Sequence, residues 1–289
     1  MKKLIANCVV VGIFLLIAVP ANADIAVTTA TNADDLVNNI MGTGISYSNV
    51  SYTGVIGASG FFTNGLDAGL QISSGIVLTS GSASNIGPVN TSDAITTGNY
   101  GYDSAYGDSD LNGLIPGDTT YDATVLEFDF VSAGDAAYFN YAFGSDEYDE
   151  WVGSPYNDVF GFFFNGTNVA LITGTTTPVS INNINNGSNS TYYNDNDMDF
   201  YWPDPVPYAF EYDGFTDGFT AQILGLTAGA TYHIKLAIAD AGDPILDSGV
   251  FIQGESFSDE PEPIVPVPGA VLLGMLGLSV AGLKLRKSS

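Results

Sequence analysis

Histidine, cysteine and basic residues are scarce in this chain of 289 residues, which has one His, one Cys and six Lys or Arg against 32 Asp or Glu. Zinc sites are built from His and Cys ligands, so this composition argues against one. A nucleophilic triad needs a base, and the one candidate, His233, shares the outward face of an expected strand with Lys235. These absences indicate that the protein is not an enzyme.

The N-terminus predicts export and removes the single cysteine. Two lysines precede an apolar stretch, about residues 8–19, and an Ala-Asn-Ala cleavage box ends at Ala23. This layout is typical of a secretory signal peptide over residues 1–23, cleaved after Ala23. Because Cys8 leaves with it, the mature chain has no disulfide, and its stability depends on core burial with metal as a supplement.

The remaining ectodomain, residues 24–262, is almost devoid of positive charge. Lys235 is its one basic residue against all 32 carboxylates, which gives a formal charge of −31. Such a surface would repel nucleic acid, so no nucleic-acid partner is expected, and it would repel anionic lipid. Divalent cations are its natural counter-ions. The alternative is that the charge serves only solubility.

The C-terminus predicts a membrane anchor. After a short linker at 258–263, residues 264–283 carry no charge and are mostly apolar, close to the roughly 20 residues that span a bilayer as a helix. A basic tail at 284–289 predicts a cytoplasmic end. We therefore expect a transmembrane helix over about 264–283 that lies in the inner membrane.

The same terminus resembles a PEP-CTERM sorting signal of the VPxPA-like variant, which occupies residues 264–289 with a literal PEP just upstream. The resemblance implies recognition by an exosortase-type sorting enzyme in a Gram-negative-type bacterium that makes exopolysaccharide. The expected location is the membrane, the cell surface or the extracellular matrix. The motif residues are Pro261, Glu262, Pro263, Val265, Pro266, Val267, Pro268, Gly269 and Ala270.

Short alternating segments predict an all-β ectodomain. Leu126, Phe128 and Phe130 alternate with acidic residues, as expected for a strand with one buried face. Residues 34–44 give the best helical pattern. The architecture expected for residues 24–257 is an antiparallel β-sandwich or jelly roll with a short N-terminal helix. The expected strands are 45–57, 74–81, 124–132, 136–144, 158–166, 168–174, 219–226, 231–240 and 248–257.

Several blocks of the chain resemble the choice-of-anchor L domain. The most characteristic is FGSDEYDEWVGSPYNDVFGFFFNG (143–166), an F-x-S-x-E-Y turn followed by N-D-x-F-x-F, and TYHIKLAIADAGDPILDSGVFIQ (231–253) is another. The resemblance covers roughly residues 35–257. It implies secretion and surface retention, without a defined activity. Gly144 departs from the pattern, in which a small residue such as Ala is more usual.

Acidic residues gather in these two blocks and predict a calcium site. Calcium takes six to eight oxygen ligands from carboxylates, amides and carbonyls. Carboxylates this close, with no local Lys or Arg, would otherwise raise one another's pKa. If the strands adjoin, the two acidic loops could share one ion; the alternative is two solvated turns. The candidate ligands are Asp146, Glu147, Asp149, Asn157, Asp158, Asp240, Asp243 and Asp247.

A weaker calcium signal lies in DSDLNG (108–113). Asp108, Asp110 and Asn112 match the first half of a D-x-D-x-[DN]-G loop. Position twelve is Thr119 instead of the usual Glu, and no helices are expected around it. The pattern therefore predicts a generic calcium turn and not an EF-hand.

These features predict an exported, surface-anchored or matrix-associated protein with a structural or adhesive role, stabilised by Ca²⁺. The alternative is a carbohydrate-binding module or a hydrolase that acts on extracellular polysaccharide. Glycoside hydrolysis needs only two carboxylates, and Asp146 and Glu147 lie beside two aromatic residues, Tyr148 and Trp151, in the sequence.

Overall fold

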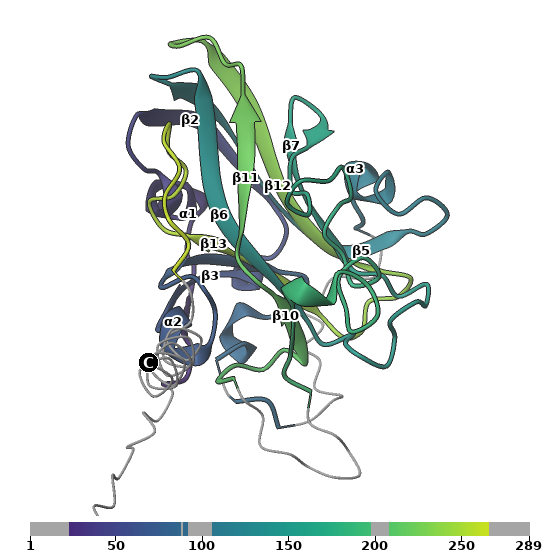
Figure 1. Cartoon of the computed structure of the whole chain (residues 1–289). Helices are drawn as coiled ribbons and strands as arrows, with labels where there is room; N and C mark the ends of the chain where they lie inside the picture. Colours follow the sequence, from purple (N-terminus) through teal and green to yellow (C-terminus); the bar gives the residue numbers. More distant parts are fainter. Residues whose placement is uncertain (1–22, 88, 92–105, 198–207, 266–289) are drawn as a thin grey trace, which may run out of the picture.

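Two antiparallel β-sheets make up the part of the chain that the structure, a computed structural model, describes, namely residues 23–87, 89–91, 106–197 and 208–265 (Figure 1). In the larger sheet, seven strands follow the order β1-β3-β4-β13-β6-β10-β9, and β11 shares one edge of β6 with β10. Figure 1 shows β6 and β11 upright while β3 and β13 cross the lower half, so this sheet is strongly twisted. Its strands are β1 (Ala26–Thr29), β3 (Ser59–Thr63), β4 (Gly75–Thr79), β6 (Ala136–Ser145), β9 (Tyr193–Asp195), β10 (Gly214–Thr216), β11 (Phe219–Leu224) and β13 (Ser248–Gln253).

The smaller sheet has five strands in the order β2-β5-β12-β7-β8. Its centre is the long pair of β5 and β12, whose register places Leu236 opposite Leu126 and Ile234 opposite Phe128. The strands are β2 (Ile45–Thr53), β5 (Thr120–Ser132), β7 (Val159–Phe164), β8 (Thr167–Asn168) and β12 (Thr231–Ala241). The expected all-β class and the two-sheet arrangement are therefore confirmed.

The main helix, α1 (Ala33–Ile40), begins at an Asn32 cap, whose side chain accepts a hydrogen bond from the Asp35 amide at 2.9 Å. Its buried face packs against β2 and β4. The helix confirms the expected helical pattern but ends four residues earlier than predicted. The other short helices are α2 (Gly65–Ala68), α3 (Ser109–Asn112), η1 (Ile56–Ala58), η2 (Ala83–Asn85) and η3 (Ser190–Tyr192).

An aromatic core fills the space between the sheets. Phe128 and Phe130 of β5 are fully buried, while the acidic residues between them stay partly exposed, as the alternation predicted. Across the interface, Tyr141 of β6 meets Phe162 of β7 with ring centroids 5.0 Å apart. Burial of one such side chain contributes about 1.5–3 kcal/mol, so the chain can hold this fold without a disulfide.

Most expected strands are present, with one clear error and several omissions. The expected strand 168–174 is wrong beyond Asn168, because the Asn168 side chain accepts the backbone amides of Phe162 and Ala170, both at 3.0 Å, in place of strand pairing. Sequence alternation also missed four strands, which are short or contain glycine: β1, β3, β9 and β10.

The expected terminal segments lie almost wholly outside the described residues. This applies to the signal peptide before Ala23 and to the transmembrane helix after Val265. Within the residues that are described, no helix is long and apolar enough to span a membrane. The linker expected at 258–263 lies on the domain: Ser258 pairs with Tyr138, and the Asn140 side chain donates to the Glu262 carbonyl at 2.9 Å.

Candidate metal centre

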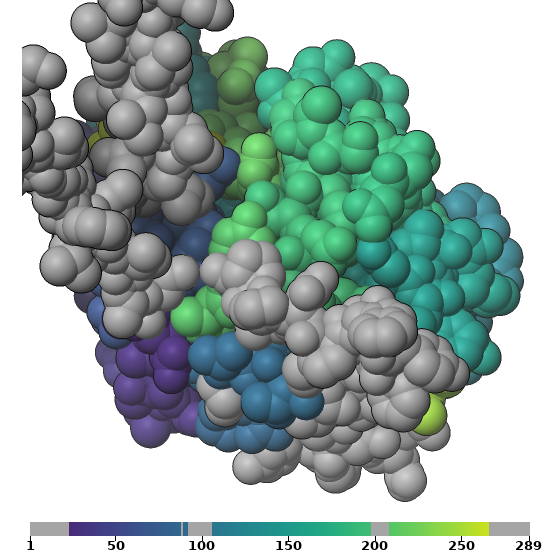
Figure 2. Space-filling view, turned by 60° about the horizontal axis from the view of Figure 1, so that its bottom comes forward, coloured from purple at the N-terminus to yellow at the C-terminus, as the bar shows by residue number. Residues whose placement is uncertain are grey.

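Eight acidic side chains are buried at the end of the molecule where β6 of the larger sheet and β12 of the smaller sheet both end. None is more than 6 % exposed. Figure 2 turns the lower end of the molecule toward the viewer, and there segments far apart in the sequence meet, drawn in blue, teal and green. We call these residues the carboxylate cluster: Asp122, Asp146, Glu147, Asp158, Glu211, Asp213, Asp240 and Asp247.

Strand pairing in the larger sheet brings part of the cluster together. Ser145, the last residue of β6, lies opposite Ser248 of β13 on one edge and Gly214 of β10 on the other. The residues next to these three in the chain are acidic. The Asp146 amide donates to the Asp247 carbonyl at 3.1 Å, so the two acidic loops identified in the sequence meet in space.

Asp158 joins the two sheets. It directly precedes β7, and its Oδ1 accepts the Ala241 amide of β12 at 2.8 Å. Its Oδ2 accepts the Ser248 hydroxyl of β13 at 2.7 Å. Asp240, next to Ala241, lies opposite Tyr121 of β5, beside Asp122. The smaller sheet thus contributes its own acidic residues to the same place.

Several cluster oxygens accept no hydrogen bond in the described structure. This holds for both oxygens of Asp146, which is 2 % exposed, and for both oxygens of Asp240, which is fully buried. The Ser80 hydroxyl lies near Asp240 but donates to the Ser248 carbonyl at 3.3 Å. A buried carboxylate without a donor costs several kcal/mol if it is charged. The cluster therefore needs protons or cations.

Burial and mutual repulsion raise the pKa values of the cluster. Burial first, then the charges of Asp213 and Asp247, hold the pKa of Asp146 well above its usual range. Burial raises the pKa of Asp158 to about 8 and that of Glu211 to about 7. These shifts show that the cluster disfavours its own negative charge.

Positive side chains do not compensate the cluster. Within the described ranges, Lys235 makes ion pairs with two acidic residues near α3, and the His233 ring nitrogens lie within 3.5 Å of carboxylate oxygens of Glu127 and Asp129. Both side chains lie on the same face of β12. The surface position expected for His233 is confirmed, since its side chain is half exposed.

The cluster side chains do not yet converge on one point. No group of three or more His, Cys, Asp or Glu among the described residues is arranged to ligate a single ion. A cation would have to draw the carboxylates inward by side-chain rotation. The side chains of Asp146 and Asp240 can rotate in this way, because no hydrogen bond reaches their carboxylate oxygens.

The profile of the choice-of-anchor L domain matches residues 24–258 of this chain. The chain belongs to this family. Membership indicates a cell-surface or extracellular protein. No curated protein and no solved structure matches the chain.

The choice-of-anchor L domain brings together five of the eight predicted ligands, Asp146, Glu147, Asp158, Asp240 and Asp247. Asp243 lies at the rim, close enough to Glu147 to raise its pKa.

Two predicted ligands lie apart from the cluster. Asp149 accepts the Tyr193 hydroxyl at 2.9 Å, and Asn157 accepts the Asn182 amide at 2.9 Å. Their side-chain oxygens are thus engaged elsewhere in the domain.

Three cluster residues were not predicted: Asp122, Glu211 and Asp213. None of the three lies in a dense run of acidic residues like the one at 146–150, so a search for acidic runs does not find them. One feature of the sequence could have found two of them: Glu211 and Asp213 stand in EYDGFT (211–216), within the range that resembles the choice-of-anchor L domain. In the structure, Asp122 has a left-handed backbone with φ of 46°, a conformation uncommon outside Gly, Asn, Asp and His.

The weaker site expected at 108–113 is built for another purpose. Asp108 caps α3, accepting the Asp110 and Leu111 amides at 2.9 and 3.1 Å, and it also binds Lys235 at 2.5 Å. Asn112 accepts the Thr120 amide at 2.8 Å. These contacts hold α3 against β12, and calcium binding at this turn stays a prediction.

Two glycines make room for the ring of Tyr212, the residue between Glu211 and Asp213 in the chain. Gly144 and Gly249 are register partners, and the ring of Tyr212 lies over both. A Cβ on Gly144 would lie 2.8 Å from the Tyr212 ring. This close approach explains why this chain has glycine at position 144. The fully buried Tyr212 ring holds Glu211 and Asp213 against the sheet.

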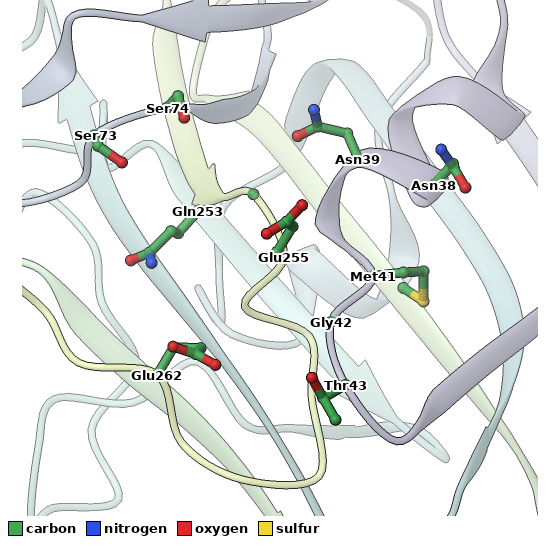
Figure 3. A pocket seen from close by; sticks show the side chains of 11 residues that line it. Asn38, Asn39, Met41, Gly42, Thr43, Ser73, Ser74, Gln253, Glu255 and Glu262 are labelled. Atoms are coloured by element: carbon green, nitrogen blue, oxygen red, sulfur yellow. The ribbon is translucent and has the colours of Figure 1, made fainter.

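A separate polar cleft of about 780 Å³ lies at the opposite end of β13 (Figure 3). Figure 3 shows Asn39, Ser74 and Glu255 around it, with Glu262 on the linker side. Two carboxylates and several amide and hydroxyl groups line the cleft, but no aromatic ring does.

Proposed function

We propose that this protein is exported and retained at the cell surface or in the extracellular matrix, where it has a structural or adhesive role, and that calcium bound in the carboxylate cluster holds its ectodomain together. Family membership supports the location. The N-terminal sequence supports export, and the C-terminal motif supports processing by an exosortase-type enzyme and attachment to the inner membrane.

Asp146 carries the calcium proposal. Its carboxylate is 2 % exposed, and neither oxygen accepts a hydrogen bond. Its charge is repelled by those of other buried acids, among them Asp213 and Asp247. A bound cation turns this mutual repulsion into attraction, because each carboxylate then faces a positive charge.

Calcium fits the donor set better than other common cations. The cluster offers carboxylate, amide and backbone oxygens, which hard cations prefer. Zinc prefers His and Cys, which this end of the domain does not supply. Magnesium demands a near-ideal octahedron and keeps several waters, whereas calcium accepts the irregular, crowded geometry of a buried cluster.

A calcium titration tests the proposal on the full-length protein, purified in mild detergent and stripped of metal with EDTA. The melting temperature should rise with calcium, because the ion binds the native state; the stabilisation is about 2.7 kcal/mol at 100 times Kd. Asp146→Asn should reduce the rise. Asp135→Asn is the matched control, an exposed carboxylate at the other end of β6 that should keep it. No rise at millimolar calcium contradicts the proposal.

Polysaccharide binding is the second candidate function, and the polar cleft favours it. Asp146 and Glu147 are each 2 % exposed and Tyr148 is fully buried, so this group offers no accessible acid pair to a sugar, although the ring of Trp151 is 41 % exposed. In the cleft, by contrast, the exposed side chains of Glu255 and Asn38 offer carboxylate and amide groups to sugar hydroxyl groups (Figure 3).

A glycan array with polysaccharide turnover assays separates the two functions. Binding that is lost in Glu255→Gln and kept in Asp146→Asn would assign sugar recognition to the cleft. Turnover that is lost in Asp146→Asn or Glu147→Gln would overturn the proposal that the protein is not an enzyme.

The anchor is tested by truncation before Ile264. The shortened protein should appear in the medium, while the full chain stays with the cells. Retention of the truncated protein contradicts the membrane anchor and the sorting signal together.

A further inference from the structure

The cluster contains two buried carboxylates without hydrogen bonds, and they come from different sheets. Asp146 directly follows β6 of the larger sheet, and Asp240 lies on β12 of the smaller sheet. Both are at most 2 % exposed, and no hydrogen bond reaches any of their four oxygens. The negative charge of each carboxylate therefore needs its own proton or cation to balance it.

Each of these carboxylates has its own acidic neighbours. Beside Asp146 lie Glu211 and Asp213, because β10 begins directly after them and pairs with the end of β6 through Gly214 and Ser145. One oxygen of Glu211 is also buried without a hydrogen bond. This first group belongs wholly to the larger sheet and the segment that leads into β10.

The neighbours of Asp240 belong to the smaller sheet. Asp122 follows Tyr121, the register partner of Asp240, and Asp158 accepts the amide of Ala241, the next residue on β12. Asp158 and Asp240 lie close enough to share a proton when one of them is neutral. A cation can take the place of that proton.

Asp247 lies between the two groups. Its carbonyl accepts the Asp146 amide at 3.1 Å, and the next residue, Ser248, donates its hydroxyl to Asp158 at 2.7 Å. Its charge acts on both groups, since it raises the pKa of Asp146 as well as that of Asp240. A carboxylate in this position can bridge two ions, one with each oxygen.

The number of oxygens also fits two ions. Eight buried carboxylates carry sixteen oxygens. One calcium ion takes about six to eight oxygens, so a single ion would leave about half of them uncoordinated in a buried, acidic environment. Two ions take about 12 to 16 oxygens, and the seven carboxylates other than Glu147 supply fourteen.

Resting on the proposed calcium binding, we propose that the cluster binds two divalent cations. One lies among Asp146, Glu211 and Asp213, and the other among Asp122, Asp158 and Asp240, with Asp247 shared between them. The first ion ties the segment before β10 to the larger sheet. The second ties β5, β7 and β12 together at their ends. Glu147 caps the cluster toward the rim.

Native mass spectrometry of the full-length protein, released from detergent in calcium, counts the ions directly. The unaltered protein should carry two calcium ions. Asp240→Asn and Glu211→Gln should each carry one, since each variant damages a different centre. The control Asp135→Asn should carry two. Circular dichroism on each variant establishes that it is folded.

The outcomes separate this inference from the function on which it rests. One ion on the unaltered protein overturns the second centre and leaves calcium binding intact. No ion at millimolar calcium overturns both. Two ions on a folded Asp240→Asn or Glu211→Gln protein, or none on either, overturns the division of residues between centres. The count on the unaltered protein needs no variant, so a variant that fails to fold does not weaken the test.

Discussion

Without calcium, the protein should lose stability as the pH rises from 5 to 8. Six of the cluster carboxylates have folded-state pKa values above those of the unfolded chain, so the folded state binds more protons than the unfolded state in this range. They are Asp122, Asp146, Glu147, Asp158, Glu211 and Asp240. Asp122 is raised to about 6, Glu211 to about 7 and Asp158 to about 8, in each case mainly by burial. The contribution of these three residues to the free energy of unfolding is fully present below about pH 4. It is lost as the pH rises through their folded-state pKa values.

Asp158 sets the magnitude, because it is fully buried. Each pH unit between its unfolded and folded pKa lowers the free energy of unfolding by about 1.4 kcal/mol. Three units, from pH 5 to pH 8, give a loss of about 4 kcal/mol from this residue. In a domain of this size that lowers the melting temperature by on the order of 10 °C.

The assay is thermal unfolding of the full-length protein in detergent, followed by circular dichroism at pH 5, 6, 7 and 8, in EDTA and in millimolar calcium. In EDTA the melting temperature should fall with rising pH. In calcium it should stay level or rise, because protons compete with the ion for the same oxygens. A melting temperature in EDTA that is flat or rises over this range would refute the reasoning.

Three substitutions test other parts of the account. Gly144→Ala places a methyl group 2.8 Å from the fully buried Tyr212 ring and should cost about 1–3 kcal/mol by overpacking, measured by urea unfolding; a neutral result would show that the ring is not held there. Asp149→Asn should leave calcium affinity within about twofold in a calorimetric titration, since its side chain binds Tyr193, and a tenfold loss would return it to the cluster. Lys235→Met removes the partner of Asp108 and should destabilise the domain by about 1–3 kcal/mol without changing calcium affinity; a change in affinity would link α3 to the cluster.

Strand alternation and acidic density were sufficient to predict the fold class and five of the eight cluster residues. Leu126, Phe128 and Phe130 point inward as a period of two requires. Asp146 and Asp247 could be paired in advance because each directly adjoins a strand of the same sheet, and the loops at one sheet edge meet when those strands pair.

The positions of the other three cluster residues, Asp122, Glu211 and Asp213, depend on the long-range register of paired strands. Local sequence patterns do not contain this register. Glu211 and Asp213 reach Asp146 because β10, only three residues long, pairs with the last residues of β6. Asp122 joins through the register of β5 and β12. Such pairings join residues more than sixty positions apart in the sequence. The strand that carries the first of these pairings, β10, has too few residues to show a period.

Sequence proximity groups Asp149 with Asp146, but the structure gives their carboxylates different neighbours. Asp149 stands three residues after Asp146, in a turn where side-chain directions do not follow the alternation of a strand. Its carboxylate binds Tyr193, while Asp146 points into the cluster. In the same way, Asp108 and Asn112 resembled ligands because helix caps and calcium turns favour the same residue types.

An anomalous difference map from crystals of the protein grown in calcium tests the central claim most directly. The account predicts peaks inside the carboxylate cluster, at about 2.3–2.6 Å from oxygens of Asp146 and Asp240. Well-ordered density for these side chains with no anomalous peak beside either of them, in crystals grown at millimolar calcium, would contradict it.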